Sequence, residues 1–423
     1  MSEKKHKERR RKERAKKEEP KVNKISDVKM AYIMYGKKAF IVPIVVMVIL
    51  GAIIWGIVYN ARKDNAPQET ADNQKEQINY IWGEIKPGKK NANNYTMVTS
   101  ADGIQVPVPT GYTASSASDE NSVNGGFVIY EGTEEVTDSN KWEAQCNRNQ
   151  YVWIPIAEVS DMYWRDQTTG KKYGTRYTFS SSAYTKDSTS KREPQTTSRD
   201  IQSTYLTQYL NGMSREDFLM EMEIDFDKML NSVATYGGYY IGRYQTGDLS
   251  QATPVVKRIN TDLVSQNWWQ MWKKARKLSG TSAGVQMIWG IQWDETLKWL
   301  IDTGEKTYAE IASDSTSWGN YNNNSFTYYT NTSKSTATKA SNRNTRIPSG
   351  AYEGANANNV FDLAGNVWDW TCESNGSGTG YGRYLRGGGY GDDGYYDYAA
   401  NRGGNYPSDS YDSIGLRCAL YIK

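Results

Sequence analysis

The side chains that could do chemistry are few and unevenly placed in this chain of 423 residues. The single histidine, His6, lies in a charged N-terminal segment, so the rest of the chain cannot contain a His-based catalytic triad, metal site or general base. The three cysteines, Cys146, Cys372 and Cys418, include no CxxC spacing. Their number is compatible with one disulfide plus a free thiol, or with three reduced thiols.

Two segments near the C-terminus concentrate tyrosine and aspartate. Residues 391–398 read GDDGYYDY and residues 403–413 read GGNYPSDSYDS. Tyrosine offers a large contact area at low entropic cost, and small polar residues offer adaptable hydrogen bonds, as in antibody paratopes. The composition predicts a ligand-binding surface; the alternative is a low-complexity surface loop without a partner. The predicted ligand-binding residues are Asp392, Asp393, Tyr395, Tyr396, Asp397, Tyr398, Asn405, Tyr406, Asp409, Tyr411 and Asp412.

The overall charge hides a strong asymmetry. The formal net charge is +3, but residues 1–38 contain fifteen lysines and arginines against six acidic residues, which leaves a mildly acidic remainder. An acidic body argues against nucleic-acid binding. With 32 tyrosines and 14 tryptophans, the chain is too aromatic to be disordered and is expected to contain a folded domain with β-sheet.

Residues 39–59 (AFIVPIVVMVILGAIIWGIVY) contain no charge. As a helix they would span about 31 Å, close to the bilayer hydrocarbon core of about 30 Å. A cleaved signal peptide is disfavoured because 38 mostly polar and charged residues precede the run. We therefore expect a single-pass protein of the cell membrane. Its basic tail, residues 1–38, should stay in the cytoplasm and its C-terminal domain should be extracellular.

The elements expected to position the two segments are short. Residues 60–103 are polar and are predicted to be a stalk or linker, and residues 104–423 a folded ectodomain with an insertion at about 165–212. Helices are expected at residues 214–233, 267–278 and 294–301, and strands at 104–109, 125–132, 151–156 and 236–244. Few helices with short strands and long loops indicate an α+β fold. Six tryptophans are predicted to be core residues rather than a sugar-stacking platform: Trp268, Trp269, Trp272, Trp289, Trp293 and Trp299.

The C-terminal motifs resemble a known family. Residues 356–370 (NANNVFDLAGNVWDW) resemble the signature of the formylglycine-generating, sulfatase-modifying-factor family. The runs RGGGY at 386–390, AANR at 399–402 and IGLRC at 414–418 are similar to further elements of that family. The resemblance spans roughly residues 126–423. It implies a C-type-lectin-like core of small twisted sheets and two helices, with function carried by long irregular loops.

The resemblance also indicates which chemistry is missing. Enzymes of the family are expected to bind copper through two cysteines after the RGG motif, and those positions are Asp392 and Asp397 here. Carboxylates provide neither a thiolate nucleophile nor a soft copper site. The related iron-dependent sulfoxide synthases need several histidines, which the body lacks. We therefore expect no enzyme activity, no copper and no iron. The alternative is a formylglycine-generating-type oxidase or another catalytic member of the family.

Calcium is the cofactor that the resemblance implies. The family segment D-x-x-G-x-V-x-E holds Ca²⁺, and its ligand positions fall on Asp362, the carbonyls of Gly365 and Val367, and Asp369. Oxygen-only ligation suits this hard cation. Aspartate at position 369 reaches less far than the family's glutamate. The alternative is a polar loop whose aspartates accept hydrogen bonds from backbone amides.

The framework around the Tyr/Asp segments is intact, and only the segments themselves have the narrow composition described above. This arrangement resembles the variable region of proteins diversified by retroelements, which share the C-type-lectin-like fold. The resemblance implies an external protein or glycan as the ligand.

Overall fold

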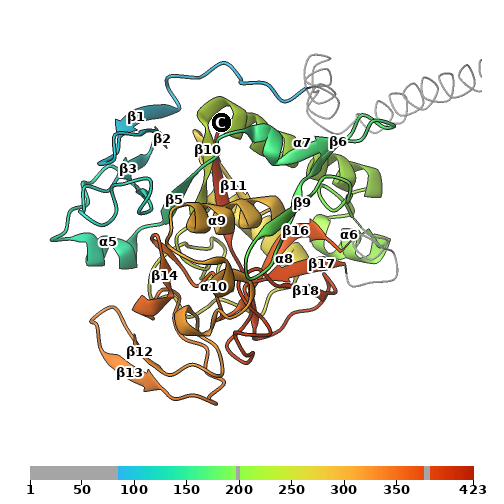
Figure 1. Cartoon of the computed structure of the whole chain (residues 1–423). Coiled ribbons are helices and arrows are strands. Elements are labelled where there is room, and N and C mark those ends of the chain that lie inside the picture. Colours follow the sequence, from blue (N-terminus) through green and yellow to red (C-terminus); the bar gives the residue numbers. More distant parts are fainter. Residues whose placement is uncertain (1–83, 197–200, 376–381) are drawn as a thin grey trace, which may run out of the picture. The chain divides into compact units, whose positions relative to one another are not determined.

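The computed structural model describes residues 84–196, 201–375 and 382–423 (Figure 1). They belong to one compact unit, Lys75–Lys423. The predicted membrane span at 39–59 and the basic tail lie outside the described residues. Within the described ranges, no helix is both long enough and apolar enough to span a bilayer.

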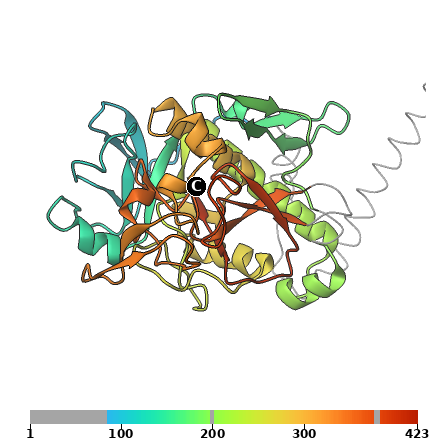
Figure 2. The same cartoon turned by 60° about the horizontal axis from the view of Figure 1, so that its bottom comes forward.

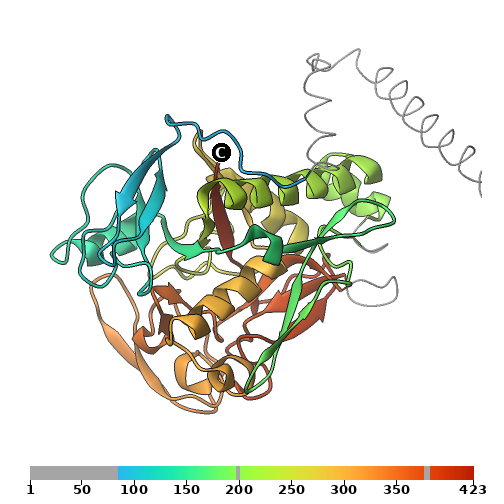
Figure 3. The ribbon, with the colours of Figure 1, turned by 45° about the horizontal axis from the view of Figure 1, so that its top comes forward.

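A six-stranded sheet forms the centre of the unit. Its strand order is β11-β20-β10-β5-β4-β3, and every neighbouring pair is antiparallel. The strands are β3 (Tyr112–Ala114), β4 (Val128–Glu131), β5 (Gln150–Pro155), β10 (Gly238–Gly242), β11 (Ala283–Met287) and β20 (Cys418–Ile422). All five residues of β10 are buried, and helices contact the strands β5, β10, β11 and β20 of this sheet. Figure 3 shows α7 (Arg215–Tyr236) on one side of these strands and α9 (Gly290–Asp302) on the other.

The helix boundaries follow from capping residues. The Ser214 side chain accepts a hydrogen bond from the Asp217 amide at 3.0 Å and so begins α7, which extends three residues past the predicted end. The helix α8 (Trp268–Ala275) begins after Asn267, the first residue of the predicted helix, whose side chain caps it, and continues as a 3₁₀ turn to Leu278. The helix α9 begins four residues before the prediction, because Gln292 caps the Trp289 amide where no Ser, Thr, Asn or Asp marks the start.

A second sheet carries the two Tyr/Asp segments. Its order is β18-β17-β16-β19, with β16 and β19 parallel and the other pairs antiparallel. The strands are β16 (Trp368–Ser374), β17 (Arg383–Arg386), β18 (Arg402–Asn405) and β19 (Ile414–Leu416). Figure 2 shows these orange-to-red strands side by side. The first Tyr/Asp segment therefore connects β17 to β18, and the second covers the end of β18 and its connection to β19.

The folded unit extends further toward the N-terminus than the sequence indicates. The strand β1 (Tyr95–Thr99) pairs with β2 (Gln105–Pro109), so the end of the predicted stalk at 60–103 is part of a hairpin. The polarity of residues 60–100 conceals this strand, since all five of its side chains remain at least partly accessible.

The predicted insertion at about 165–212 is more ordered than a surface loop. It contains β7 (Lys172–Gly174), β8 (Arg176–Phe179), β9 (Tyr184–Asp187) and α6 (Ser203–Leu210). The Lys172 ammonium is buried and lies 2.6 Å from the Asp227 carboxylate of α7. A lysine, which in the sequence would be expected on the surface, therefore anchors the segment to α7. The smaller elements are α5 (Lys141–Asn147), β6 (Tyr163–Arg165), α10 (Tyr308–Ala312), β12 (Phe326–Tyr329), β13 (Thr336–Lys339), β14 (Asn356–Ala357) and β15 (Val360–Phe361).

The six predicted core tryptophans are all buried, which confirms the core interpretation. Trp268 and Trp269 on α8 pack edge-on with ring centroids 5.1 Å apart. The ring of Phe218 on α7 packs against the Trp269 ring, with the two ring centroids 5.0 Å apart. These aromatic contacts join α7 and α8 and leave no tryptophan of this group on the surface for sugar stacking.

Candidate functional site

Buried charges fix the strands from which the Tyr/Asp segments extend. The Arg386 guanidinium on β17 donates to the Asp294 carboxylate of α9 at 2.8 Å. The Arg402 guanidinium on β18 donates to the Glu373 carboxylate of β16 at 2.9 Å and also pairs with Asp294. All four side chains are at most 8% exposed. The ends of the first segment are therefore held to α9 and β16 by ion pairs away from solvent.

A buried tyrosine holds the first segment against the framework. The Tyr321 hydroxyl lies 2.8 Å from the Gly387 carbonyl oxygen and 2.9 Å from the Asp397 carbonyl oxygen. Gly388 has φ of +77°, and a Cβ there would collide with the Asp397 carbonyl. Glycine is required at this position because the segment folds back on its own start.

Trp368 lies between the two segments. Its indole Nε1 donates to Asp392 Oδ2 at 2.7 Å. Its ring packs against the backbone of Gly389 and Gly403, where an added Cβ would lie 3.1 Å and 3.2 Å from the nearest ring atom. Trp368 was not among the predicted site residues. Strand alternation could have indicated it, because Asp369 points into the core and its neighbour must therefore face the opposite side.

The predicted tyrosines differ in exposure. Tyr395 is 44% exposed, Tyr396 69% and Tyr411 50%, while Tyr398 and Tyr406 are half-buried. The rings of Tyr395 and Tyr396 contact each other with centroids 4.2 Å apart. Within the described residues, Met97 and Ile104 are the only other large apolar side chains that are exposed. The remaining predicted ligand-binding residues are Asp412, which is exposed, and Asp392, Asp393, Asp397, Asn405 and Asp409, which are half-buried.

The two aspartates at the expected cysteine positions lie close together in the first segment. Asp392 Oδ2 accepts hydrogen bonds from Trp368 and from the Gly389 amide, and Asp397 Oδ1 accepts one from Asn401 at 2.7 Å. Burial raises the pKa of Asp392, and burial together with the charge of Asp392 raises the pKa of Asp397. Both carboxylates therefore already accept hydrogen bonds from residues outside the segment.

The predicted calcium ligands Asp362 and Asp369 are both buried. Asp362 Oδ2 accepts from the Gly350 amide at 2.7 Å, and Asp369 Oδ2 accepts from Arg417 Nε at 3.2 Å. The second oxygen of each carboxylate, Oδ1, is buried without a hydrogen-bond partner. Burial raises the pKa of both side chains, that of Asp369 to about 6. Each carboxylate thus retains one oxygen that a hard cation could bind.

The other two predicted ligand positions belong to the same turn. Gly365 has φ of +71° and packs against the backbone of Asn320. The Val367 carbonyl accepts from Gln245 Nε2 at 2.7 Å, and this amide also lies 3.3 Å from Asp369 Oδ2. No motif in the sequence points to Gln245 as a neighbour of this turn. Arg417, in the IGLRC run, also donates to the Asp362 carbonyl at 3.0 Å, so a guanidinium lies beside the turn.

All three cysteines are free. Cys372 and Cys418 are buried, and burial raises the pKa of each thiol to about 12. Cys146 is half-buried, and burial raises the pKa of its thiol as well. Of the two alternatives stated for the cysteines, three reduced thiols is therefore the one that this structure has.

The family described as the sulfatase-modifying factor enzyme 1-like domain matches residues 105–422. The chain belongs to this family, and the predicted C-type-lectin-like α+β fold is confirmed. Among solved structures it is similar to Treponema denticola variable protein 1, with 16% identity, a TM-score of 0.28 and coverage of 44% of this chain and 85% of that one. It is also similar to CarF, with 15% identity, a TM-score of 0.30 and coverage of 44% and 87%. No curated protein matches the chain.

Proposed function

We propose that this protein is a ligand-binding member of the sulfatase-modifying factor family, and that the segments 391–398 and 403–413 form its binding surface. The observation that carries the proposal is the share of the exposed aromatic side chains that falls in these two segments. Of five exposed large apolar or aromatic residues in the described part of the chain, three are tyrosines of these segments. Exposed aromatic groups rimmed by polar residues are typical of interaction sites.

The ligand that suits this surface is an external protein or a glycan. Tyrosine rings pack on both, and tyrosine is enriched among residues that dominate binding energy. The aspartates of the segments supply acceptors for hydroxyl, amide and ammonium donors. Buried ion pairs at Arg386 and Arg402 keep the strands in place, so the exposed side chains can differ without altering the fold.

Paired substitutions test the surface. The full chain would be screened against a glycan array and a displayed peptide library, and each ligand found would be titrated. Tyr395→Ala with Tyr396→Ala should weaken binding by roughly 2–4 kcal/mol. Met97→Ala is the matched control, because Met97 is 42% exposed but lies outside both segments. Equal losses in the two variants, or no loss in the tyrosine variant, would refute this location.

The family's oxidase chemistry is not expected from this surface, because Asp392 and Asp397 stand where two cysteines would be needed. The test is incubation of the full chain with Cu(I), oxygen and cysteine-containing peptides, followed by mass spectrometry. We expect unmodified peptide. Formation of formylglycine would establish the catalytic alternative and overturn this part of the proposal.

We further propose that residues 39–59 anchor the protein in the cell membrane as a single span and that the C-terminal domain is displayed outside. The uncharged run and the basic segment before it support this topology. Protease added to intact cells should remove the C-terminal domain and spare the basic tail. Full protection of the domain would show that the orientation is wrong.

Calcium is the proposed cofactor of the turn at residues 362–369. The donors fit the ion, because Asp362 and Asp369 each have a buried carboxylate oxygen without a hydrogen-bond partner, and Gly365 and Val367 of the same turn supply backbone carbonyls. Asp362, Gly365, Val367 and Asp369 would hold the ion, which would cross-link the turn and offset the cost of burying the two carboxylates. A chelator should lower the melting temperature of the full chain. Asp362→Asn should remove that effect while retaining an acceptor for the Gly350 amide, whereas Asp409→Asn should not; an identical melt with and without chelator would refute the site.

A further inference from the structure

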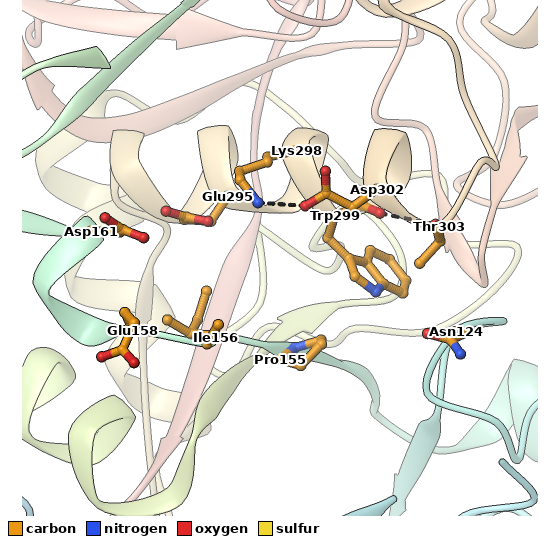
Figure 4. A pocket seen from close by; sticks show the side chains of 11 residues that line it. Asn124, Pro155, Ile156, Glu158, Asp161, Glu295, Lys298, Trp299, Asp302 and Thr303 are labelled. Atoms are coloured by element: carbon orange, nitrogen blue, oxygen red, sulfur yellow. Dashed lines mark hydrogen bonds and ion pairs between the residues drawn. The ribbon is translucent and has the colours of Figure 1, made fainter. Parts of the chain in front are cut away.

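A cavity of about 330 Å³ lies between α9 and the segment that follows β5. Neither Tyr/Asp segment contributes to it. Its walls include Ile156, Glu158, Asp161, Glu295, Trp299 and Asp302 (Figure 4). Residues 295, 299 and 302 are spaced at about one and two turns along α9, so they share one face of that helix. The cavity is large enough for a small organic group rather than a single ion.

The cavity is strongly acidic. Four carboxylates and one lysine line it. The Lys298 ammonium pairs with Asp302, and Lys186 pairs with Asp161 at 2.6 Å. In the described part of the chain, neither Glu158 nor Glu295 takes part in an ion pair. The lining therefore contains more carboxylates than ammonium groups.

Three of the four carboxylates, those of Glu158, Asp161 and Glu295, lie at one end of the cavity (Figure 4). Figure 4 shows the carboxylates of Asp161 and Glu295 pointing toward each other, with Glu158 at the same end. Glu295 is 7% exposed, and its Oε1 accepts from the Tyr177 hydroxyl at 2.7 Å. Burial raises the pKa of Glu295 to about 7, and a cationic ligand would lower it again.

A second observation concerns Trp299, which lines the same cavity. Its side chain is 5% exposed, and its indole Nε1 is buried without a hydrogen-bond partner. Figure 4 shows the indole extending from α9 into the space between this helix and Pro155. A buried N–H without an acceptor is costly, so a ligand that brings an acceptor to it would be favoured. The indole face also attracts cations.

The carboxylate spacing argues against a metal ion. Among the described residues, no group of three or more carboxylate, histidine or cysteine side chains is placed to hold one. Hydrogen bonds from N–H to oxygen are longer than metal–oxygen bonds. An ammonium group, with its three N–H donors, can therefore reach carboxylates that are too far apart to ligate one metal ion.

We propose that this cavity binds an alkylammonium ligand of the lysine type. The ammonium would lie among Glu158, Asp161 and Glu295, and the aliphatic stem would pass Ile156 and the Trp299 ring. An acceptor such as an amide carbonyl would take the Trp299 Nε1 hydrogen. The same chemistry is offered by free lysine and by a lysine residue in a peptide.

Calorimetric titration of the full chain at pH 8 and low salt tests the proposal, with Nα-acetyl-lysine methylamide as the probe. We expect saturable binding of this probe and none of Nα-acetyl-norleucine methylamide, which lacks the ammonium. Cadaverine, which lacks the acceptor, should bind at least tenfold more weakly. L-lysine in a parallel titration separates the two sources, since tighter binding of the blocked probe indicates a peptide and tighter binding of lysine indicates the free amino acid.

Three variants locate the binding. Glu295→Gln keeps an acceptor for Tyr177 and should weaken probe binding at least tenfold. Glu158→Gln changes an exposed side chain that cannot unfold the domain, and it should weaken binding several-fold. Glu143→Gln, on an exposed face of α5, is the matched control and should bind as the parent does. Absence of saturable binding, equal binding of the norleucine probe, or parental affinity in both cavity variants would overturn the proposal.

Discussion

Replacement of two tyrosines by phenylalanine separates the framework from the binding surface. Tyr321→Phe and Tyr396→Phe remove the same hydroxyl, but from opposite environments. The Tyr321 side chain is fully buried, and its hydroxyl lies within 2.9 Å of the Gly387 and Asp397 carbonyl oxygens. The Tyr396 side chain is 69% exposed. The first variant should therefore lose stability, and the second should not.

The magnitude follows from the partners that remain. The Gly387 carbonyl keeps a second donor, the Gly365 amide at 2.7 Å, whereas Tyr321→Phe leaves the Asp397 carbonyl without the hydroxyl. Leaving a buried polar group unsatisfied costs about 1–3 kcal/mol. The Tyr396 side chain is largely exposed, so Tyr396→Phe removes a hydroxyl that faces water. Changes at such surface positions alter the free energy of unfolding by no more than about 0.5 kcal/mol.

Urea unfolding of the full chain, followed by tryptophan fluorescence, gives the comparison. We expect the midpoint of Tyr321→Phe to fall clearly and that of Tyr396→Phe to match the parent protein. Ligand titration adds a second readout, because Tyr321 holds the first Tyr/Asp segment in place. Equal midpoints for the two variants would refute the assignment of Tyr321 to the framework.

Further predictions rest on other contacts. Glu120 is buried against Arg243 at 2.6 Å, so Glu120→Gln, which leaves that guanidinium uncompensated, should cost about 3–5 kcal/mol at pH 7. Burial alone would raise the pKa of Glu120, but Arg243 and the hydrogen bonds hold it below its ordinary value. The stabilisation is therefore present above the unfolded pKa of about 4.3 and is lost as the pH falls through the lower folded pKa, so the stabilities of parent and variant should converge only at acidic pH below that folded pKa. Gly388→Ala should destabilise by about 1 kcal/mol or more, whereas Gly391→Ala, where a Cβ meets nothing closer than 3.9 Å, should unfold as the parent does. Iodoacetamide at pH 8 should reach no thiol other than Cys146 in the native protein and all three after unfolding, because Cys372 and Cys418 are buried with pKa values near 12; rapid labelling of either in the native state would contradict the structure.

The sequence predicted the elements whose residues carry a local signal. Ser214 and Asn267 mark helix starts in the sequence and cap the helices in the structure. The start of α9 was missed because it depends on Gln292, which is an ordinary residue for a helix interior. The strand β1 was missed because its stability comes from pairing with β2 rather than from an apolar pattern of its own.

The candidate site could be predicted only in part, for a physical reason. The composition of residues 391–413 indicated which side chains are available for contact, but exposure depends on neighbours distant in the sequence. Asp392 resembles its neighbours in the sequence, yet the Trp368 indole engages its carboxylate. Arg417 and Gln245 meet the predicted calcium turn only after the strands assemble.

These contacts divide the two Tyr/Asp segments into positions that hold the scaffold and positions that are free to change. Asp392 is joined to Trp368, and the Asp397 carbonyl is joined to Tyr321. The side chains of Tyr395 and Tyr396 are exposed and contact chiefly each other. A binding surface that accepts many sequences needs this division, because substitutions at the exposed positions then alter what is bound without removing a buried partner. On this argument Asp392 belongs with the scaffold, and ligand specificity should follow Tyr395, Tyr396 and Tyr411.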